Sequence, residues 1–124
     1  MILGIDFDET IVRGKYPAID GLMPYAKETI NALKQQGHYI IINTCRSGDE
    51  LLKAINYLLE HGIAFDRVND NHPEQTRLYN NNSRKIYAHV YIDDKNLHGF
   101  PGWKVVGEEV ARMEQEYKQS ISMQ

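Results

Sequence analysis

Carboxylates and a threonine follow several apolar segments of the chain. Asp6 and Asp8 end the first such segment, Thr44 ends the second, and Asp93 and Asp94 follow a short one near the C-terminal end. If folding brings them together, these carboxylates repel one another unless a cation neutralises them. Oxygen ligands of this kind suit Mg²⁺ better than zinc. The pattern therefore predicts a magnesium site.

The elements that must position these residues are predicted from the apolar pattern. We expect strands over residues 1–7, 39–43, 63–68 and 90–92. Helical patterns between them predict an α/β protein, a three-layer α/β/α sandwich with a parallel Rossmann-like sheet and helices on both faces. Parallel strands bring their carboxyl ends to one edge, where ligands bind in open α/β sheets.

Apolar side chains at helical spacing predict the helices between the strands. Their expected buried stripes are Ala26, Ile30 and Leu33; then Leu52, Ile55 and Leu59; and finally Val106, Val110, Met113 and Tyr117. Pro24 favours the start of the first helix, and Ser47 with Glu50 predicts a capping box for the second. Residues 11–22 predict a loop or small flap, and residues 69–84 an irregular connection with one helical turn.

The chain resembles the haloacid dehalogenase-like hydrolase superfamily, in its small capless phosphatase branch. The resemblance rests on three motifs: the Asp-x-Asp-x-Thr of DFDET, the strand-ending threonine of IIINTCR and the acidic pair of VYIDDK. It extends over residues 1 to about 100, and the last helix fits as the closing layer. The resemblance implies a Rossmann-like fold and a Mg²⁺-dependent hydrolase acting on phosphate monoesters.

The resemblance also implies a role for each matching residue. Asp6 would be the nucleophile that forms an aspartyl-phosphate, and Asp8 would protonate the leaving oxygen and then activate water. Thr44 would hydrogen-bond a phosphoryl oxygen. Mg²⁺ would bridge Asp6, the backbone carbonyl of Asp8, and Asp93 or Asp94.

The third motif of that family, a lysine, departs from the usual spacing. Lys85 lies only 8 residues before Asp93, whereas the family's lysine usually lies further upstream. It remains the best candidate because it follows a loop that can fold over the sheet edge. Three other cations stay open as alternatives: Arg77, Arg84 and Lys95.

No segment is left over for a cap domain, so we expect an open site. Residues 11–43 and 45–84 are used up by predicted helices, strands and loops. Thr10 and Arg46 are assigned to substrate binding, with Arg46 either clamping a substrate phosphate or carboxylate, or capping its loop. An open site implies either a large substrate, such as a protein or nucleic-acid end, or closure by a neighbouring subunit. Capless relatives acting on small sugar phosphates often use an oligomer for that closure, which favours a homo-oligomer and a small-molecule substrate.

Two rival interpretations stay open. A phosphoryl-accepting regulatory domain also uses a strand-end Asp, a Thr, a Lys and Mg²⁺, but it has no need of Asp8 two residues after the acceptor. A protein that binds a phosphorylated ligand without turnover is the second rival. Both rivals differ from an enzyme in that they do not hydrolyse substrate repeatedly, so a measurement of turnover distinguishes them from a phosphatase.

Composition bounds the remaining choices. The 124 residues predict a single domain over residues 1–124, and 14 basic against 17 acidic side chains give a net charge of −3, which argues against nonspecific nucleic-acid binding. The single cysteine, Cys45, favours a reducing compartment. No secretion signal and no apolar run long enough for a membrane span are recognisable, so a cytoplasmic protein without membrane contact is expected.

Overall fold

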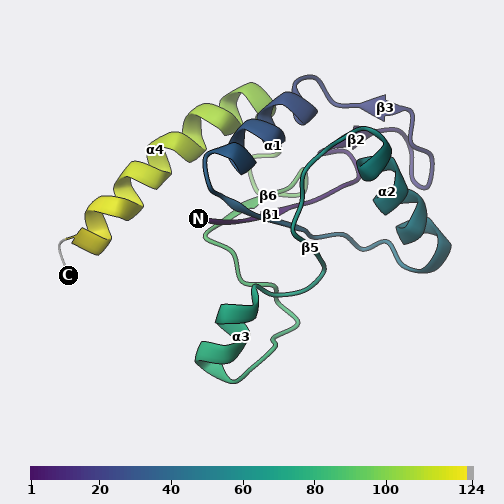
Figure 1. Cartoon of the computed structure of the whole chain (residues 1–124). Helices are drawn as coiled ribbons and strands as arrows, with labels where there is room; N and C mark the ends of the chain where they lie inside the picture. Colours follow the sequence, from purple (N-terminus) through teal and green to yellow (C-terminus); the bar gives the residue numbers. More distant parts are fainter. Residues whose placement is uncertain (123–124) are drawn as a thin grey trace.

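A four-stranded parallel sheet forms the centre of the molecule (Figure 1). The computed structural model describes residues 1–122. The strands of the sheet are β1 (Ile2–Ile5), β4 (Tyr39–Ile42), β5 (Arg67–Val68) and β6 (Val90–Ile92), in the spatial order β5-β4-β1-β6. All four residues of β1 are buried, so this central strand is covered on both faces.

Side chains alternate between the two faces of the sheet, which are covered differently. Leu3 and Ile5 lie on what we call the first face, in one core cluster with residues of α1 (Ala26–Gln35), α2 (Gly48–Glu60) and α4 (Trp103–Ser122). Helices α1 and α4 also contact each other. Ile30 and Val110 are buried, as the helical pattern predicts, but Tyr117, expected on the same stripe as Val110, is exposed.

The opposite, second face has a thinner cover. Its cluster contains Ile2 and Ile41 of the strands and Ile86 and Ala88 of the extended segment before β6. Helix α3 (Pro73–Tyr79) lies on this side of the molecule and has no buried residue (Figure 1). The molecule is therefore a three-layer α/β fold as expected, but one outer layer is mostly an extended segment and not a full set of helices.

Residues 11–22, expected as a loop or flap, form a small antiparallel hairpin. Its strands are β2 (Val12–Arg13) and β3 (Gly21–Leu22). The hairpin follows Thr10 directly and lies beside α2 in Figure 1. It is too short to form a separate cap over the sheet edge.

Two expectations for α2 are wrong. Ser47 is the N-cap residue but its side chain makes no capping hydrogen bond, so the capping box is not formed. Leu52 and Leu59 are exposed, and the buried stripe contains Ala54 and Leu58. The helix carries apolar residues along two neighbouring stripes, and periodicity alone cannot choose which one faces the sheet.

The strands are also shorter than the apolar pattern suggests. The first ends at Ile5 because the chain turns at Phe7, whose carbonyl accepts hydrogen bonds from the N–H groups of Ile11 and Val12. The third has only Arg67 and Val68 in the sheet. Among residues 1–122, none of the helices is long and apolar enough to cross a bilayer.

Candidate active site at the carboxyl edge of the sheet

The sheet brings the predicted chemical residues to one edge. Strand β1 lies between β4 and β6, so the residues that follow these three strands are neighbours. The N–H of Asp6 donates to the carbonyl of Ile92 at 2.9 Å, and the N–H of Asn43 donates to the carbonyl of Ile5 at 2.8 Å. Asp6, Thr44 and Asp93 therefore extend from adjacent strand ends, as the sequence predicts.

Three carboxylates form an acidic cluster at this edge. One oxygen each from Asp6, Asp93 and Asp94 lies within 4.8 Å of the others. Burial, the hydrogen bond with Asp94 and the charge of Asp93 raise the pKa of Asp6 to about 7. Burial opposes ionisation of Asp94, but hydrogen bonds with Asp6 and Asp93 outweigh it and lower the pKa of Asp94. The cluster thus holds either a proton or a cation.

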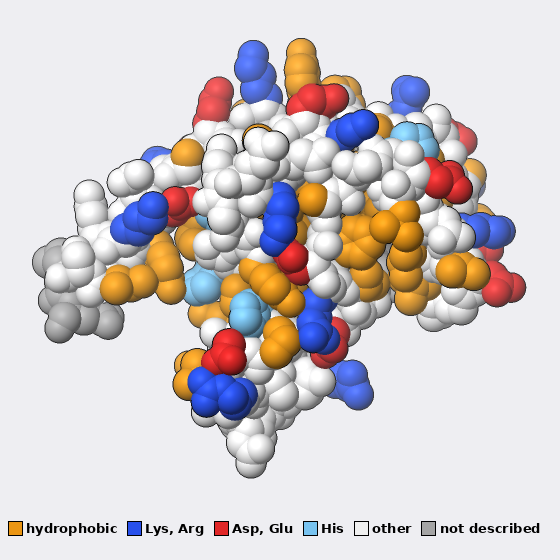
Figure 2. Space-filling model, viewed as in Figure 1, with side chains coloured by type: hydrophobic (Ala, Val, Ile, Leu, Met, Phe, Trp, Pro, Cys, Tyr) orange, Lys and Arg blue, Asp and Glu red, His pale blue; other side chains and the backbone are white. Residues whose placement is uncertain are grey.

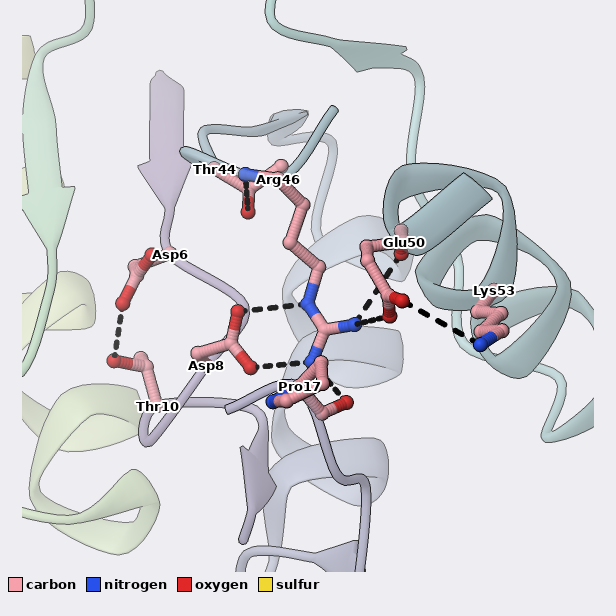
Figure 3. A network of polar contacts seen from close by, with 8 residues as sticks. All are labelled: Asp6, Asp8, Thr10, Pro17, Thr44, Arg46, Glu50 and Lys53. Atoms are coloured by element: carbon pink, nitrogen blue, oxygen red, sulfur yellow. Dashed lines mark hydrogen bonds and ion pairs between the residues drawn. The ribbon is translucent and has the colours of Figure 1, made fainter. Parts of the chain in front are cut away.

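The acidic cluster fits a hard divalent cation. Its donors are carboxylate oxygens, which Mg²⁺ prefers, and they converge closely enough to share one ion. Burial is the largest cause of the raised pKa of Asp6, and a cation there would offset both the burial and the repulsion from the neighbouring carboxylates. Asp8 was expected among the metal ligands through its backbone carbonyl. Its carboxylate points toward Arg46 and away from Asp6, as Figure 3 shows.

Thr10 supports the acidic cluster from below the surface. Its hydroxyl accepts from the N–H of Asp94 at 3.0 Å and lies 3.2 Å from a carboxylate oxygen of Asp6, to which it donates. Its carbonyl accepts the indole N–H of Trp103 at 2.7 Å, which ties the motif to α4. Thr10 is fully buried, so the expectation that it binds substrate is wrong. Its role is to position two of the carboxylates.

Asp8 pairs with a buried arginine (Figure 3). Nε and one terminal nitrogen of Arg46 donate to the two oxygens of Asp8 at 2.8 and 2.7 Å. The same guanidinium donates to the carbonyls of Pro17 and Glu50 and lies over the ring of Phe7. Hydrogen bonding to Asp8 raises the pKa of Arg46.

Arg46 was expected to clamp a substrate anion or to cap its loop. Its side chain is only 1% exposed, and its donors are used by Asp8, the hairpin at Pro17 and α2. The clamp is therefore not the arrangement found here. Arg46 acts as a positioning residue that links three segments around Asp8.

Thr44 is held by a residue that sequence reasoning missed. The side-chain amide of Asn69 accepts the N–H of Thr44 at 2.8 Å and donates to its carbonyl at 2.9 Å. Asn69 has a positive φ of 51°, a conformation that asparagine tolerates better than most residues. The Thr44 hydroxyl accepts the N–H of Arg46 at 3.1 Å. Asn69 directly follows the short β5, and this position at a strand end is the feature from which it could have been predicted.

Lys85 lies beside the acidic cluster, on the second face. It lines a cavity of about 350 Å³ together with Asp93, Asn43 and Tyr91, and its ammonium group lies 5.8 Å from the centre of the Tyr91 ring. We call this space the side cavity. Gly4 also lines it, and a Cβ there would meet Tyr91 at 3.3 Å, so this position favours glycine.

The alternatives to Lys85 are placed differently. Arg84 lines the side cavity as well. Lys95 is exposed, with its ammonium group 3.5 Å from a carboxylate oxygen of Asp94. Arg77 lies on α3 and pairs with Glu74, away from the sheet edge, so it is the weakest candidate.

The fold and the site together define a class: a small Rossmann-like α/β domain with an acidic cluster at the carboxyl edge of its sheet. No family model matches the chain, and no curated protein is similar to it. A solved structure of a conserved protein from Bacteroides thetaiotaomicron is 35% identical, with a TM-score of 0.82 over 91% of each chain. The chain belongs to the family of this conserved Bacteroides protein.

Proposed function

We propose that this protein is a Mg²⁺-dependent phosphomonoester hydrolase that works as the haloacid dehalogenase-like phosphatases do. The observation that carries the proposal is the acidic cluster next to Asp8 and Thr44 at one sheet edge. Asp6, the proposed nucleophile, belongs to that cluster, while Asp8, the proposed acid and base, is held separately by Arg46. Nucleophile and proton carrier are thus two carboxylates in different surroundings.

In the first half-reaction, an oxygen of Asp6 attacks phosphorus and the ester P–O bond breaks. Asp8, in its protonated form and turned from Arg46 to the leaving oxygen, gives that oxygen its proton. In the second half-reaction, Asp8 takes a proton from water, which attacks the aspartyl-phosphate and releases phosphate. Thr44 and Lys85 hydrogen-bond and neutralise the phosphoryl oxygens. Asp6, either Asp93 or Asp94, and the Asp8 carbonyl would hold Mg²⁺, which would supply charge stabilisation.

The Asp8–Arg46 pair favours a module without turnover, in either of the two rival forms. Two charge-assisted hydrogen bonds fix the orientation of the Asp8 carboxylate, but they also occupy both of its oxygens. A module that accepts a phosphoryl group, or only binds a phosphorylated ligand, needs no mobile proton carrier. Such a module would bind or become phosphorylated stoichiometrically, whereas the hydrolase releases many phosphates per chain.

Phosphate release from 4-nitrophenyl phosphate tests the proposal. We expect multiple turnovers with Mg²⁺, loss of activity with a chelator, and loss of activity in Asp6→Asn. Folding of the variant is checked by circular dichroism. One phosphate or none released per wild-type chain in Mg²⁺ would overturn the hydrolase assignment and favour the module.

We also propose a cytoplasmic location. The single cysteine, Cys45, supports it, since proteins of oxidising compartments commonly contain disulfides. Cell fractionation tests this directly, with the protein and known marker proteins of each compartment detected by immunoblotting in every fraction.

A further inference from the structure

We propose that the substrate carries a second anionic group, bound by Arg84 in the side cavity, in addition to the phosphate that is hydrolysed. This inference rests on the proposed hydrolase function and narrows its substrate class. The class is a small phosphomonoester with a carboxylate or a second phosphate on its leaving group.

The side cavity is continuous with the reaction site. Asp93 belongs to both the acidic cluster and the cavity lining. Gly4 lines the cavity, and Asp6 comes two residues further along the same strand direction, so both lie on the second face. A leaving group attached to a phosphate at Asp6 therefore has space on this side.

Four polar side chains of the cavity have no hydrogen-bond or ion-pair partner among the described residues. No carboxylate in residues 1–122 pairs with Arg84 or Lys85, and the side-chain amides of Asn43 and Asn96 make no hydrogen bond there. Most other arginines are paired; Arg67 and Arg77, on the same side of the molecule, bind Asp70 and Glu74. Donors gathered in one cavity without partners favour a polar, anionic occupant.

Two cations in the cavity can serve two anionic groups. Lys85, with its ammonium group over the Tyr91 ring, is assigned to the phosphoryl group by the proposed mechanism. Arg84 remains, and its planar guanidinium matches a carboxylate or phosphate with two parallel hydrogen bonds. The hydrolysed phosphate alone does not account for both.

The size of the cavity limits the occupant. About 350 Å³ is at the small end of ligand pockets, which suits a leaving group of a few carbon atoms rather than a polymer. Tyr91, which lines the cavity, is 38% exposed. The substrate class is thus a compact, strongly charged metabolite.

Matched substrates test the inference. Glycerol 3-phosphate carries no second anion, 3-phosphoglycerate carries a carboxylate, and 1,3-propanediol bisphosphate carries a second phosphate. We expect KM to be about tenfold lower for the last two than for glycerol 3-phosphate, the size of one charge-assisted contact. Whichever of the two gives the lower KM identifies the second group as carboxylate or phosphate.

Arg84→Gln provides the residue-level test, and Arg77→Gln, an arginine paired on α3, is its control. In Arg84→Gln the KM advantage of the two-anion substrates should disappear while kcat stays within about twofold. Arg77→Gln should keep the advantage. Equal KM values for all three substrates in wild type, or an advantage that survives in Arg84→Gln, would overturn the inference but leave the hydrolase function standing. Absence of hydrolysis of every substrate would overturn the function itself, and the inference with it.

Discussion

Asp6 and Asp8 are separated by one residue, yet they lie in opposite electrostatic surroundings. Asp6 faces two further carboxylates, and burial together with these neighbours raises its pKa to about 7. Asp8 faces the buried guanidinium of Arg46. Asp6 therefore has no cation paired with it among residues 1–122, whereas the charge of Asp8 is balanced by Arg46.

One short motif thus places two carboxylates in different charge environments, which suits the two proposed roles. Asp6 continues the direction of β1 and meets the residues that follow β6, whereas the turn at Phe7 points Asp8 toward the loop after β4. A site that lacks positive charge attracts a cation, and a neutralised carboxylate keeps a fixed orientation.

The two aspartates should be separable by substitution. Asp6→Asn and Asp8→Asn should each reduce turnover by at least about a thousandfold, because each removes a group that takes part in bond making or proton transfer. Stabilisation by Mg²⁺ should be lost in Asp6→Asn and kept in Asp8→Asn, since only Asp6 belongs to the acidic cluster. Phosphate release and thermal midpoints with and without Mg²⁺ check this. Equal loss of Mg²⁺ stabilisation in both variants would contradict the contrast.

Removing Arg46 should show how much its pair with Asp8 contributes to stability. Arg46→Met should lower the free energy of unfolding by about 3 kcal/mol, because it leaves Asp8 without its partner and frees the carbonyls of Pro17 and Glu50. Urea unfolding measures the loss. Arg112→Met, which breaks an exposed pair on α4, is the control and should cost less than about 1 kcal/mol. Similar losses in both variants would show that the Asp8 pair is an ordinary surface contact.

The cation beside the acidic cluster should matter for rate. Lys85→Gln should reduce kcat by about a hundredfold, because it removes a positive charge from the phosphoryl oxygens. Lys95→Gln should have a much smaller effect, although Lys95 lies 3.5 Å from Asp94, because its side chain is largely exposed. Steady-state kinetics compares them. A larger loss in Lys95→Gln would assign the third motif to Lys95.

Stability should depend on pH through Asp6. Its pKa is 3.8 in the unfolded chain and about 7 in the metal-free fold, so the folded protein holds a proton that the unfolded chain releases. Stability of the metal-free protein should therefore fall as pH rises between about 4 and 7. Burial lowers the pKa of His38 and His89, which opposes this trend below about pH 6.5.

The contribution of Asp6 is isolated by comparing two proteins. With a chelator present, Asp6→Asn should melt at a temperature about 3–5 °C above wild type at pH 7.5, and the gap should shrink at pH 5. The histidines contribute equally to both proteins and cancel. A gap that is independent of pH would contradict the raised pKa of Asp6.

Strand periodicity and motif spacing predicted the parallel sheet and the meeting of Asp6 with Asp93, because both follow from local pattern and from parallel topology. The Asp8–Arg46 pair was not predicted, since it joins residues 38 positions apart through side-chain geometry that no local pattern records. The same holds for Asn69, which follows β5 and hydrogen-bonds the backbone of Thr44. The thin cover of the second face was not predicted either, because the extended segment that crosses it has no periodic apolar pattern.

Trapping a covalent intermediate tests directly whether Asp6 is the nucleophile of a phosphatase. Wild type and Asp8→Asn are incubated with labelled 4-nitrophenyl phosphate and Mg²⁺, quenched in acid, and reduced with borohydride, which converts an aspartyl-phosphate to homoserine. The account predicts modification at Asp6, found by mass spectrometry, with more of it in Asp8→Asn because water is no longer activated. Turnover by wild type together with an unmodified Asp6 in both proteins would contradict the account.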